Sequence, residues 1–540
     1  MQAQQRARQR PSWRPTAQAD GEPLAPAAAV LLTRGQGPGL EFYLVQRSPK
    51  LRVFPGFWAL PGGGLDPLDG DPQDPSLLAY RRAAARELFE ETGVLSEAAA
   101  AALSRAGLEA GALRRGLAAG EADPRGPVAR GAEQAWADQA GSVPLAPEEF
   151  EPLCWTVTPR FTQRRFRALY VHLALPSGAE PRIEPGELVA GRWVAPEALL
   201  REWRRGELDL VPPLVFLMER LAESGGRLDP AFDACERRSA AIDAGALHAV
   251  APAPGVLLMP LRTPTLPPAS TTNCVWIGGG IHYLVDPATH DPAERRRLLE
   301  FLSEQPPLAG LIVTHHHPDH VGSVEPLARE LGLPVYAHPL TLTRLPAPVP
   351  DPRPLDEGQR LPLGRAPDGQ APWELEALHT PGHDRGHLCL FERRYRTLIA
   401  GDLVSTLSTI VIEPPEGHLA TYLEQLRRVR GLDPRRLIPS HGPAVADGAE
   451  LLDLYLRHRE HRESQLLQAL LATGGAEAEG LLALVYSDVP PRLWPLARGS
   501  LWAGLHKLHA EGRVRFLPGE PPLASARSRL PAGEWRLAGP

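Results

Sequence analysis

The stretch Leu311-Ile-Val-Thr-His-His-His-Pro-Asp-His320 decides the fold of a large part of this 540-residue chain. Its apolar start predicts a buried strand, and the polar residues follow where that strand would end. Four of these residues are metal-ligand types: His315, His317, Asp319 and His320. Imidazole and carboxylate groups on one loop between a strand and a helix suit borderline metals such as Zn²⁺. The other interpretation is a surface histidine run similar to a tag.

Further residues of the same types recur along the chain. Three stand at the ends of predicted strands: His383, Asp402 and His441. This recurrence favours a metal site assembled by the fold over a tag. His316 falls outside the ligand set and is expected to be exposed, His379 to be structural or to support a ligand, and His387 to be either structural or substrate-facing.

The order H-x-H-x-D-H, then His, Asp and His, resembles the metallo-β-lactamase superfamily of hydrolases over about 250–448. The resemblance implies an αββα sandwich with two bound metal ions, Zn²⁺ first and Mn²⁺ or iron as alternatives. It implies these ligands: His315, His317 and His383 for the first metal, Asp319, His320 and His441 for the second, and Asp402 as the bridge. Asp319 also counts as a catalytic residue. Such a metal pair lowers the pKa of a shared water and supplies hydroxide as the nucleophile.

The C-terminal part, 449–540, is expected to be a winged helix. Helical patterns at 451–473, 478–486 and 495–511 precede an apolar strand at 512–517. This tail resembles the lactamase-beta-like branch of the superfamily, which includes an RNA endonuclease, while the same fold hosts thioesterases, glyoxalase-type enzymes and phosphodiesterases. From residue 451 onwards there are 11 basic and 9 acidic residues. This near balance favours packing against the metal-binding domain over nucleic-acid binding.

A second motif, Arg86-Glu-Leu-Phe-Glu-Glu-Thr-Gly-Val94, carries three carboxylates within five residues. The pattern at about 76–92 predicts a helix on which Glu87 shares a face with Glu90 and Glu91. Carboxylates this close repel one another unless a cation lies among them, and hard oxygen ligands suit Mg²⁺ or Mn²⁺. A solvated acidic helix end is the alternative interpretation.

Together with the preceding loop Leu60-Pro-Gly-Gly-Gly64, this motif resembles the Nudix box of hydrolases that cleave X-linked nucleoside diphosphates. The resemblance implies an α/β/α sandwich. It implies these roles: Glu87, Glu90 and Glu91 as ligands of Mg²⁺ or Mn²⁺, Glu90 and Glu91 as catalytic residues, and Arg86 as the arginine that stabilises the helix.

The first half of the box departs from the family pattern. Leu78 stands where the family has a glutamate, and Asp69, six residues after Gly63, is a candidate replacement. The lengthened box and an Ala-rich insertion at 96–150 are similar to those of the Nudix subgroup directed at coenzyme A and acyl-CoA.

Length and composition set the wider limits. A chain of 540 residues exceeds a single core and predicts several domains. Its net charge of −6 argues against a surface coated with basic residues for nucleic acid. The four cysteines lie far apart without a C-x-x-C pair, so a reducing cytoplasm is expected. The basic start and the apolar stretch 24–32 imitate a signal peptide, but two strands around a turn are preferred. No run approaches the ~20 apolar residues of a membrane span, so no membrane partner is expected.

The expected organisation is a disordered tail at 1–22, a Nudix domain at 23–223 with its insertion, a linker at 224–254, a metallo-β-lactamase-like domain at 255–448 and a winged helix at 449–540. The expected function is metal-dependent hydrolysis of a thioester, ester or phosphodiester, with the Nudix domain cleaving a nucleoside-diphosphate substrate such as a CoA derivative. The alternative is an RNA endonuclease whose Nudix domain is a non-catalytic nucleotide sensor. Small CoA or nucleotide conjugates are the expected partners, with RNA as the alternative, and the oligomeric state is left open.

Overall fold

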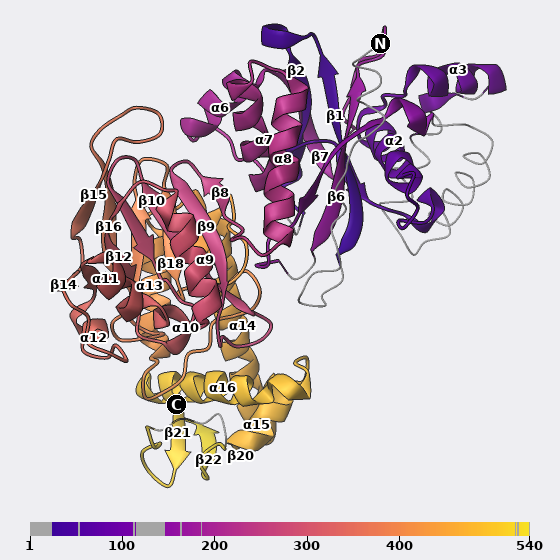
Figure 1. The fold of residues 1–540 in the computed structure, drawn as a ribbon. Coiled ribbons are helices and arrows are strands. Elements are labelled where there is room, and N and C mark those ends of the chain that lie inside the picture. The colour runs from indigo at the N-terminus through magenta and orange to yellow at the C-terminus, as the bar shows by residue number, and fades with distance from the viewer. Residues whose placement is uncertain are drawn as a thin grey trace. The chain divides into compact units, whose positions relative to one another are not determined.

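Figure 1 shows the computed structural model of the chain. It describes residues 24–51, 54–107, 109–111, 114, 146–162, 165–184, 186–523, 525 and 529–538. The expected tail at 1–22, and residues 115–145 of the expected insertion, lie outside the described residues. The chain divides into two compact units, Met1–Pro254 and Gly255–Pro540. Within the described ranges, no helix is both long and apolar enough to cross a membrane.

The first unit is built on one mixed sheet. Its strands are β1 (Ala25–Arg34), β2 (Glu41–Arg47), β3 (Trp58–Ala59), β4 (Gly62–Gly64), β5 (Glu151–Val157), β6 (Phe166–Ala174) and β7 (Leu188–Val194). The order is β3-β2-β1-β6-β5, with β4 paired to β1 and β7 to β2. Strand β1 lies in the middle and runs parallel to β6, from Ala25 opposite Phe166 to Thr33 opposite Ala174. The apolar stretch that imitates a signal peptide is therefore a central strand, which needs apolar side chains on both faces.

Helices cover both faces of this sheet. They are α2 (Leu78–Thr92), α3 (Glu97–Ala106), α6 (Pro196–Arg204), α7 (Pro212–Glu223) and α8 (Leu228–Asp243), with short 3₁₀ turns η1 (Gly37–Gly39), η2 (Pro67–Asp69) and η3 (Pro147–Glu149). Figure 1 places α2 on one side of the sheet and α6, α7 and α8 on the other. Cys154 and Trp155 of β5 belong to the two different apolar cores, because successive strand residues point to opposite faces. The expected α/β/α sandwich is confirmed.

Helix α8 lies within the segment 224–254 that was expected to be a linker. It packs against β5 and α7. Its side chains Ala231, Phe232, Cys235 and Ser239 are buried, which is one face at helical spacing. The segment is therefore part of the core of the first unit, and only strand β8 (Val250–Ala253) follows before the division of the chain.

The second unit contains two further sheets. The strands of the first are β9 (Val256–Arg262), β10 (Thr271–Gly278), β11 (His282–Val285), β12 (Leu308–Val313), β13 (Val335–Ala337) and β14 (Pro352–Pro354). Within this unit their order is β14-β13-β12-β11-β10-β9. The second sheet has the order β15-β16-β17-β18-β19, from β15 (Arg360–Gly364), β16 (Trp373–His379), β17 (Leu388–Glu392), β18 (Thr397–Gly401) and β19 (Arg436–Pro439).

The helices of this part are α9 (Pro292–Ser303), α10 (Pro318–Val321), α11 (Val324–Leu331), α12 (Pro339–Leu342) and α13 (Leu419–Arg430). Helix α11 packs against β12 of the first sheet. Helix α13 buries Tyr422 and Leu426 in one core cluster with Leu398 and Leu437 of the second sheet. The expected αββα sandwich is confirmed.

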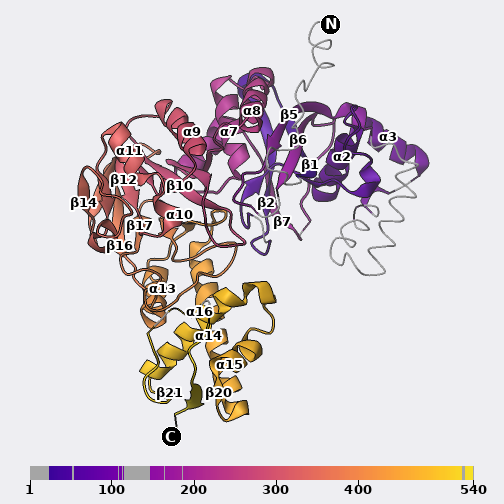
Figure 2. The ribbon, with the colours of Figure 1, turned by 60° about the horizontal axis from the view of Figure 1, so that its bottom comes forward.

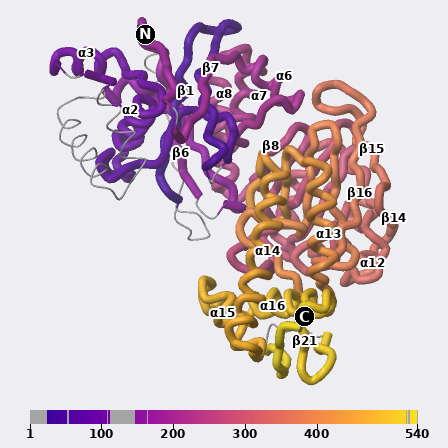
Figure 3. Tube along the Cα trace, turned by 180° about the vertical axis from the view of Figure 1, so that it is seen from behind, coloured from indigo at the N-terminus to yellow at the C-terminus, as the bar shows by residue number. Residues whose placement is uncertain are grey.

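The C-terminal part contains three helices and a small sheet. Its elements are α14 (Gly448–Thr473), β20 (Ala476–Glu477), α15 (Ala478–Val485), η4 (Pro491–Leu493), α16 (Trp494–Ala510), β21 (Val514–Leu517) and β22 (Glu534–Leu537). The sheet order is β20-β22-β21. Figures 2 and 3 show α15 and α16 beside the C-terminal half of α14. Trp502 and Trp535 are fully buried with ring centroids 5.6 Å apart, so this module has its own core, as a winged helix requires.

We expect Phe232→Ala to destabilise the first unit by about 3–5 kcal/mol, because it removes a fully buried ring from the core. Hydrogen exchange of the full-length protein, followed by mass spectrometry, should then be faster in β5, α7 and α8. Arg237→Ala, an exposed neighbour on α8, is the control and should leave exchange unchanged. Equal protection of β5 in Phe232→Ala and the parent would show that α8 is a dispensable linker.

Candidate metal centre

Three imidazoles converge at the end of β12. His315 and His317 follow this strand directly, and His383 comes from the loop after β16. Nδ1 of His317 lies 3.0 Å from Nε2 of His315 and 3.0 Å from Nε2 of His383. Burial lowers the pKa of His317 to about 3 and holds the pKa of His315 well below its usual value. Both rings are therefore neutral near pH 7 and keep a lone pair for a ligand.

A second group of donors lies beside the first. It contains Asp319 and His320 from α10 and His441 after β19. Nε2 of His441 lies 3.5 Å from Oδ2 of Asp319. Asp402, which follows β18, stands between the two groups: its Oδ2 is 3.6 Å from Nε2 of His383. Its Oδ1 is 3.6 Å from Nε2 of His320 and 3.4 Å from Nε2 of His441. One carboxylate oxygen thus faces each group.

This donor set fits a pair of divalent cations. Nε2 of His320 and Oδ1 of Asp402 are buried and have no hydrogen-bond partner among the described residues. Burial opposes the charge of Asp402, yet His441 and His320 hold the pKa of this carboxyl well below its usual value. Burial likewise opposes a charge on His441, but Asp402 and Asp319 raise its pKa to about 10. Buried charges of this kind are ordinarily paired or bound to metal, and the ligand types are those that Zn²⁺ takes.

Backbone carbonyls orient two of the imidazoles. The Nδ1–H of His383 donates to the carbonyl oxygen of Val411 at 3.0 Å, and that of His441 donates to the carbonyl oxygen of Thr271 at 2.9 Å. Each of these bonds places a proton on Nδ1 and turns Nε2, the proposed ligand atom, towards Asp402.

Two further residues support the site: Asp286, which the sequence analysis missed, and His387, which it expected to be either structural or substrate-facing. Asp286, at the end of β11, lies with Oδ2 2.8 Å from Nδ1 of His320, and it accepts hydrogen bonds from the backbone N–H and the hydroxyl of Thr314 at 2.8 and 2.7 Å. His387 is fully buried, and its Nε2 accepts the backbone N–H of Asp402 at 2.9 Å. His387 thus supports a site residue. The signal for Asp286 was a carboxylate at the end of an apolar strand.

The expectation that His316 is exposed is wrong. Only 23% of its side chain is accessible, and its Nδ1 lies 2.6 Å from Oδ2 of the fully buried Asp384. The carboxylate of Asp384 attracts the imidazole inward, because a buried charge needs a partner. His379 stacks on His338 with ring centroids 4.1 Å apart, and its Nε2 donates to the carbonyl oxygen of Arg385 at 2.8 Å.

Helix α14 holds the loop between β18 and α13, which begins at the metal-site residue Asp402. The hydroxyl of Tyr455 accepts the N–H of Ser405 at 2.8 Å and lies 2.6 Å from the carbonyl oxygen of Ser408. The buried guanidinium of Arg459 donates to the carbonyl oxygen of Ile410. Since His383 bonds to the next carbonyl, that of Val411, the helix that leads into the winged helix also fixes one wall of the site.

In the first unit, Arg86 gathers the acidic residues of the second motif. Its Nη1 lies 2.8 Å from Oε1 of Glu87 and 3.2 Å from Oε2 of Glu90. Its Nη2 lies 2.9 Å from Oδ2 of Asp69 and donates to the carbonyl oxygen of Gly64 at 3.0 Å. Asp69, in η2, thus supplies a carboxylate to Arg86 although Leu78 occupies the position where the family has a glutamate.

The glycine loop packs directly on the glutamates. The N–H of Gly62 donates to Oε2 of Glu91 at 2.9 Å, and a Cβ on Gly63 would lie only 2.5 Å from the carboxylate of Glu87. Glycine is required there for that close approach. In the part of the chain that the structure describes, Glu87, Glu90 and Glu91 do not all bring ligand atoms within 4.8 Å of one another; the sets that do lie in the second unit.

Three family models match the chain at separate places. They are the metallo-beta-lactamase superfamily at residues 267–441, the NUDIX domain at 23–155 and the beta-lactamase associated winged helix domain at 478–519. These matches agree with the two sandwiches and the C-terminal module of the fold.

Several curated proteins are similar to less than half of this chain. The "Beta-lactamase-like protein 2 homolog" of Drosophila melanogaster is 28% identical over 250 residues, covering 45% of this chain and 84% of that protein. The "Lactamase-like protein nscB" of Trichophyton rubrum is 30% identical over 267 residues, 46% of this chain and 78% of that protein. The "Hydroxyacylglutathione hydrolase" of Bdellovibrio bacteriovorus is 30% identical over 164 residues, 29% of this chain and 61% of that protein.

Fold, site and relatives define a multidomain hydrolase. The chain belongs to the metallo-β-lactamase superfamily, and it carries a Nudix domain and a winged helix in addition. The metallo-β-lactamase domain and the Nudix domain each belong to a family of hydrolases, and the members of both families generally bind divalent metals.

We expect Asp69→Asn to destabilise the first unit by about 1–3 kcal/mol, because Arg86 loses a buried charged partner while one acceptor oxygen remains. Thermal unfolding of the full-length protein should show an earlier transition for the first unit. Asp71→Asn, an exposed residue nearby, is the matched control. Identical unfolding of Asp69→Asn and the control would mean that Asp69 contributes nothing to the Arg86 network.

Proposed function

We propose that this protein is a metal-dependent hydrolase with a dinuclear centre in the second unit. The observation that carries the proposal is the position of Asp402, whose two carboxylate oxygens face separate groups of donors. The proposed ligands are His315, His317 and His383 for one ion, Asp319, His320 and His441 for the other, and Asp402 for both. Zn²⁺ suits this imidazole-rich set, with Mn²⁺ or iron as alternatives.

Chain residues prepare the site in three ways. The carbonyls of Val411 and Thr271 orient His383 and His441, Asp286 orients His320, and His387 holds the backbone of Asp402. When bound, two metal ions supply hydroxide at neutral pH by lowering the pKa of a shared water, and they polarise the group that is cleaved. We assign Asp319 a catalytic role because its carboxylate reaches into this group of donors. No nucleophilic side chain is required.

We propose an acyl substrate, a thioester or related ester, for this centre. One relative is named as a hydroxyacylglutathione hydrolase, and this supports the acyl class. The winged helix offers limited support for the RNA endonuclease alternative, because several of its basic side chains have acidic partners. Arg498 pairs with Glu479 at 3.0 Å, and Lys507 pairs with Glu463 at 2.6 Å. Paired cations release few counterions on binding a phosphate backbone.

We further propose that the Nudix domain cleaves a diphosphate, such as that of a CoA derivative, with Glu87, Glu90 and Glu91 as ligands of Mg²⁺ or Mn²⁺ and with Glu90 and Glu91 as catalytic residues. The bond from Gly62 to Glu91 places this carboxylate beside the loop, where a diphosphate would approach. A non-catalytic sensor remains the competing proposal. A reducing compartment such as the cytoplasm suits the four cysteines, which form no disulfide.

Replacement of the bridging residue tests the dinuclear centre. We expect Asp402→Ala to lower the metal content of the full-length protein and to abolish hydrolysis of a CoA thioester or glutathione thioester, because the ion pair loses its shared anionic ligand. Metal content is measured by mass spectrometry of metal-loaded, desalted protein. Asp356→Ala, an exposed residue of the same unit, should retain both properties. Full metal occupancy and turnover in Asp402→Ala would refute the assignment. Cleavage of single-stranded RNA but of no thioester would favour the alternative.

Replacement of a glutamate tests the Nudix site. We expect Glu91→Gln to reduce Mg²⁺- or Mn²⁺-dependent cleavage of CoA by about 100-fold or more, because it keeps the acceptor for Gly62 but deletes the charge that holds the cation. Glu97→Gln, an exposed residue on α3, makes the same chemical change outside the site. Cleavage by Glu91→Gln at the rate of the control would favour the sensor.

A further inference from the structure

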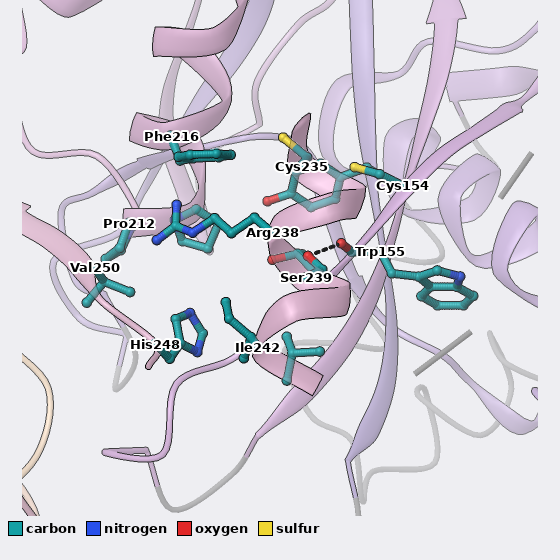
Figure 4. Close-up of a pocket in the computed structure, with 14 residues that line it drawn as sticks. Cys154, Trp155, Pro212, Phe216, Cys235, Arg238, Ser239, Ile242, His248 and Val250 are labelled. Atoms are coloured by element: carbon teal, nitrogen blue, oxygen red, sulfur yellow. Dashed lines mark hydrogen bonds between the residues drawn. The ribbon is translucent and has the colours of Figure 1, made fainter. Parts of the chain in front are cut away.

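A pocket opens in the first unit, on the face of the sheet that α7 and α8 cover (Figure 4). It is lined by residues of β5, β6, α7 and α8, by Val250 at the start of β8 and by His248 just before it. The proposed glutamate ligands lie on α2, which packs on the opposite face of the sheet. The pocket is therefore separate from the diphosphate site.

A single cation dominates the pocket. Figure 4 shows the guanidinium of Arg238 projecting into it, between Phe216 and His248. Its Cζ lies 4.1 Å from the centroid of the Phe216 ring, and its Nη2 donates to the carbonyl oxygen of Ala249. The lining contains no Asp or Glu, and no described carboxylate lies within ion-pair distance of Arg238. Burial lowers the pKa of this guanidinium, against the attraction of nearby Glu219. Such a cation lacks a close anionic partner.

The other polar groups leave this cation as the main point of recognition. The hydroxyl of Ser239 already donates to the carbonyl oxygen of Trp155 at 2.7 Å. Burial, reinforced by Arg238, lowers the pKa of His248 to about 3, so its imidazole is neutral and adds no second charge. The rest of the wall is largely apolar and includes Val157 and Ile242.

We propose that this pocket binds a small organic anion, a carboxylate attached to an apolar group. The planar guanidinium presents paired N–H donors that match the two oxygens of a carboxylate, and its stacking on Phe216 fixes the plane of that fork. The apolar wall receives the body of the ligand. This site is independent of the proposed function, because it uses none of the metal ligands or glutamates.

The test is isothermal titration calorimetry of the full-length protein with sodium benzoate. We expect saturable binding, and affinities at least about tenfold lower for benzyl alcohol, which lacks the charge, and for acetate, which lacks the apolar body. Equal affinity for benzoate and benzyl alcohol would overturn the role of the cation. Equal affinity for benzoate and acetate would overturn the role of the apolar wall, and no saturable binding at millimolar benzoate would overturn the site.

Variants locate the binding. Arg238→Gln should weaken benzoate binding at least about tenfold, the value of one charge-assisted hydrogen-bonded pair. Arg237→Gln removes the same charge from the exposed neighbour on α8 and should bind as the parent does. Arg238→Lys keeps the charge and the aliphatic stem, and it replaces Arg238→Gln in this test if that variant does not fold. It should bind benzoate several-fold more weakly than the parent, because the paired N–H donors are gone. Parental affinity in whichever Arg238 variants fold would overturn the proposal.

Discussion

The buried carboxylate of Asp402 is the constraint on which the second unit depends. A carboxylate without solvent is costly unless cations or hydrogen-bond donors surround it. Here His320, His383 and His441 face its oxygens, and His387 accepts the hydrogen bond of its backbone N–H. Strands from both sheets must end together for these side chains to meet, so the sandwich and the site depend on the same packing.

A comparable balance of charge organises the first unit. Arg86 pairs with Glu87, Glu90 and Asp69 and also reaches a carbonyl of the glycine loop, so one guanidinium joins loop, turn and helix. Asp69 takes this place because η2 inserts between loop and helix and returns its side chain towards α2. Leu78 departs from the family pattern in the sequence, but in the folded structure Arg86 still pairs with a carboxylate from this region, that of Asp69.

Helix α14 links the winged helix to the chemistry. Its first half lies in the core of the metallo-β-lactamase domain, and its second half belongs to the core of the C-terminal module. Tyr455 and Arg459 hold the loop before α13, and the side chain of Glu413 in that loop lies against Gly499 of α16. This contact supports a module that packs beside the site, as the near-balanced charge of the tail suggested.

The sequence by itself determined the fold class of the three domains through motifs that resemble known families, and it determined the residue types of the proposed metal centre. Such motifs are local, so they can be recognised without the tertiary structure. Tertiary structure alone decided the rest. It paired Asp286 with His320, placed His387 behind Asp402, drew His316 to Asp384 and made α8 part of a core. These features join residues far apart in the chain, or depend on which face a neighbouring element covers. Local patterns cannot report either, because burial and charge pairing are fixed only when the elements pack together.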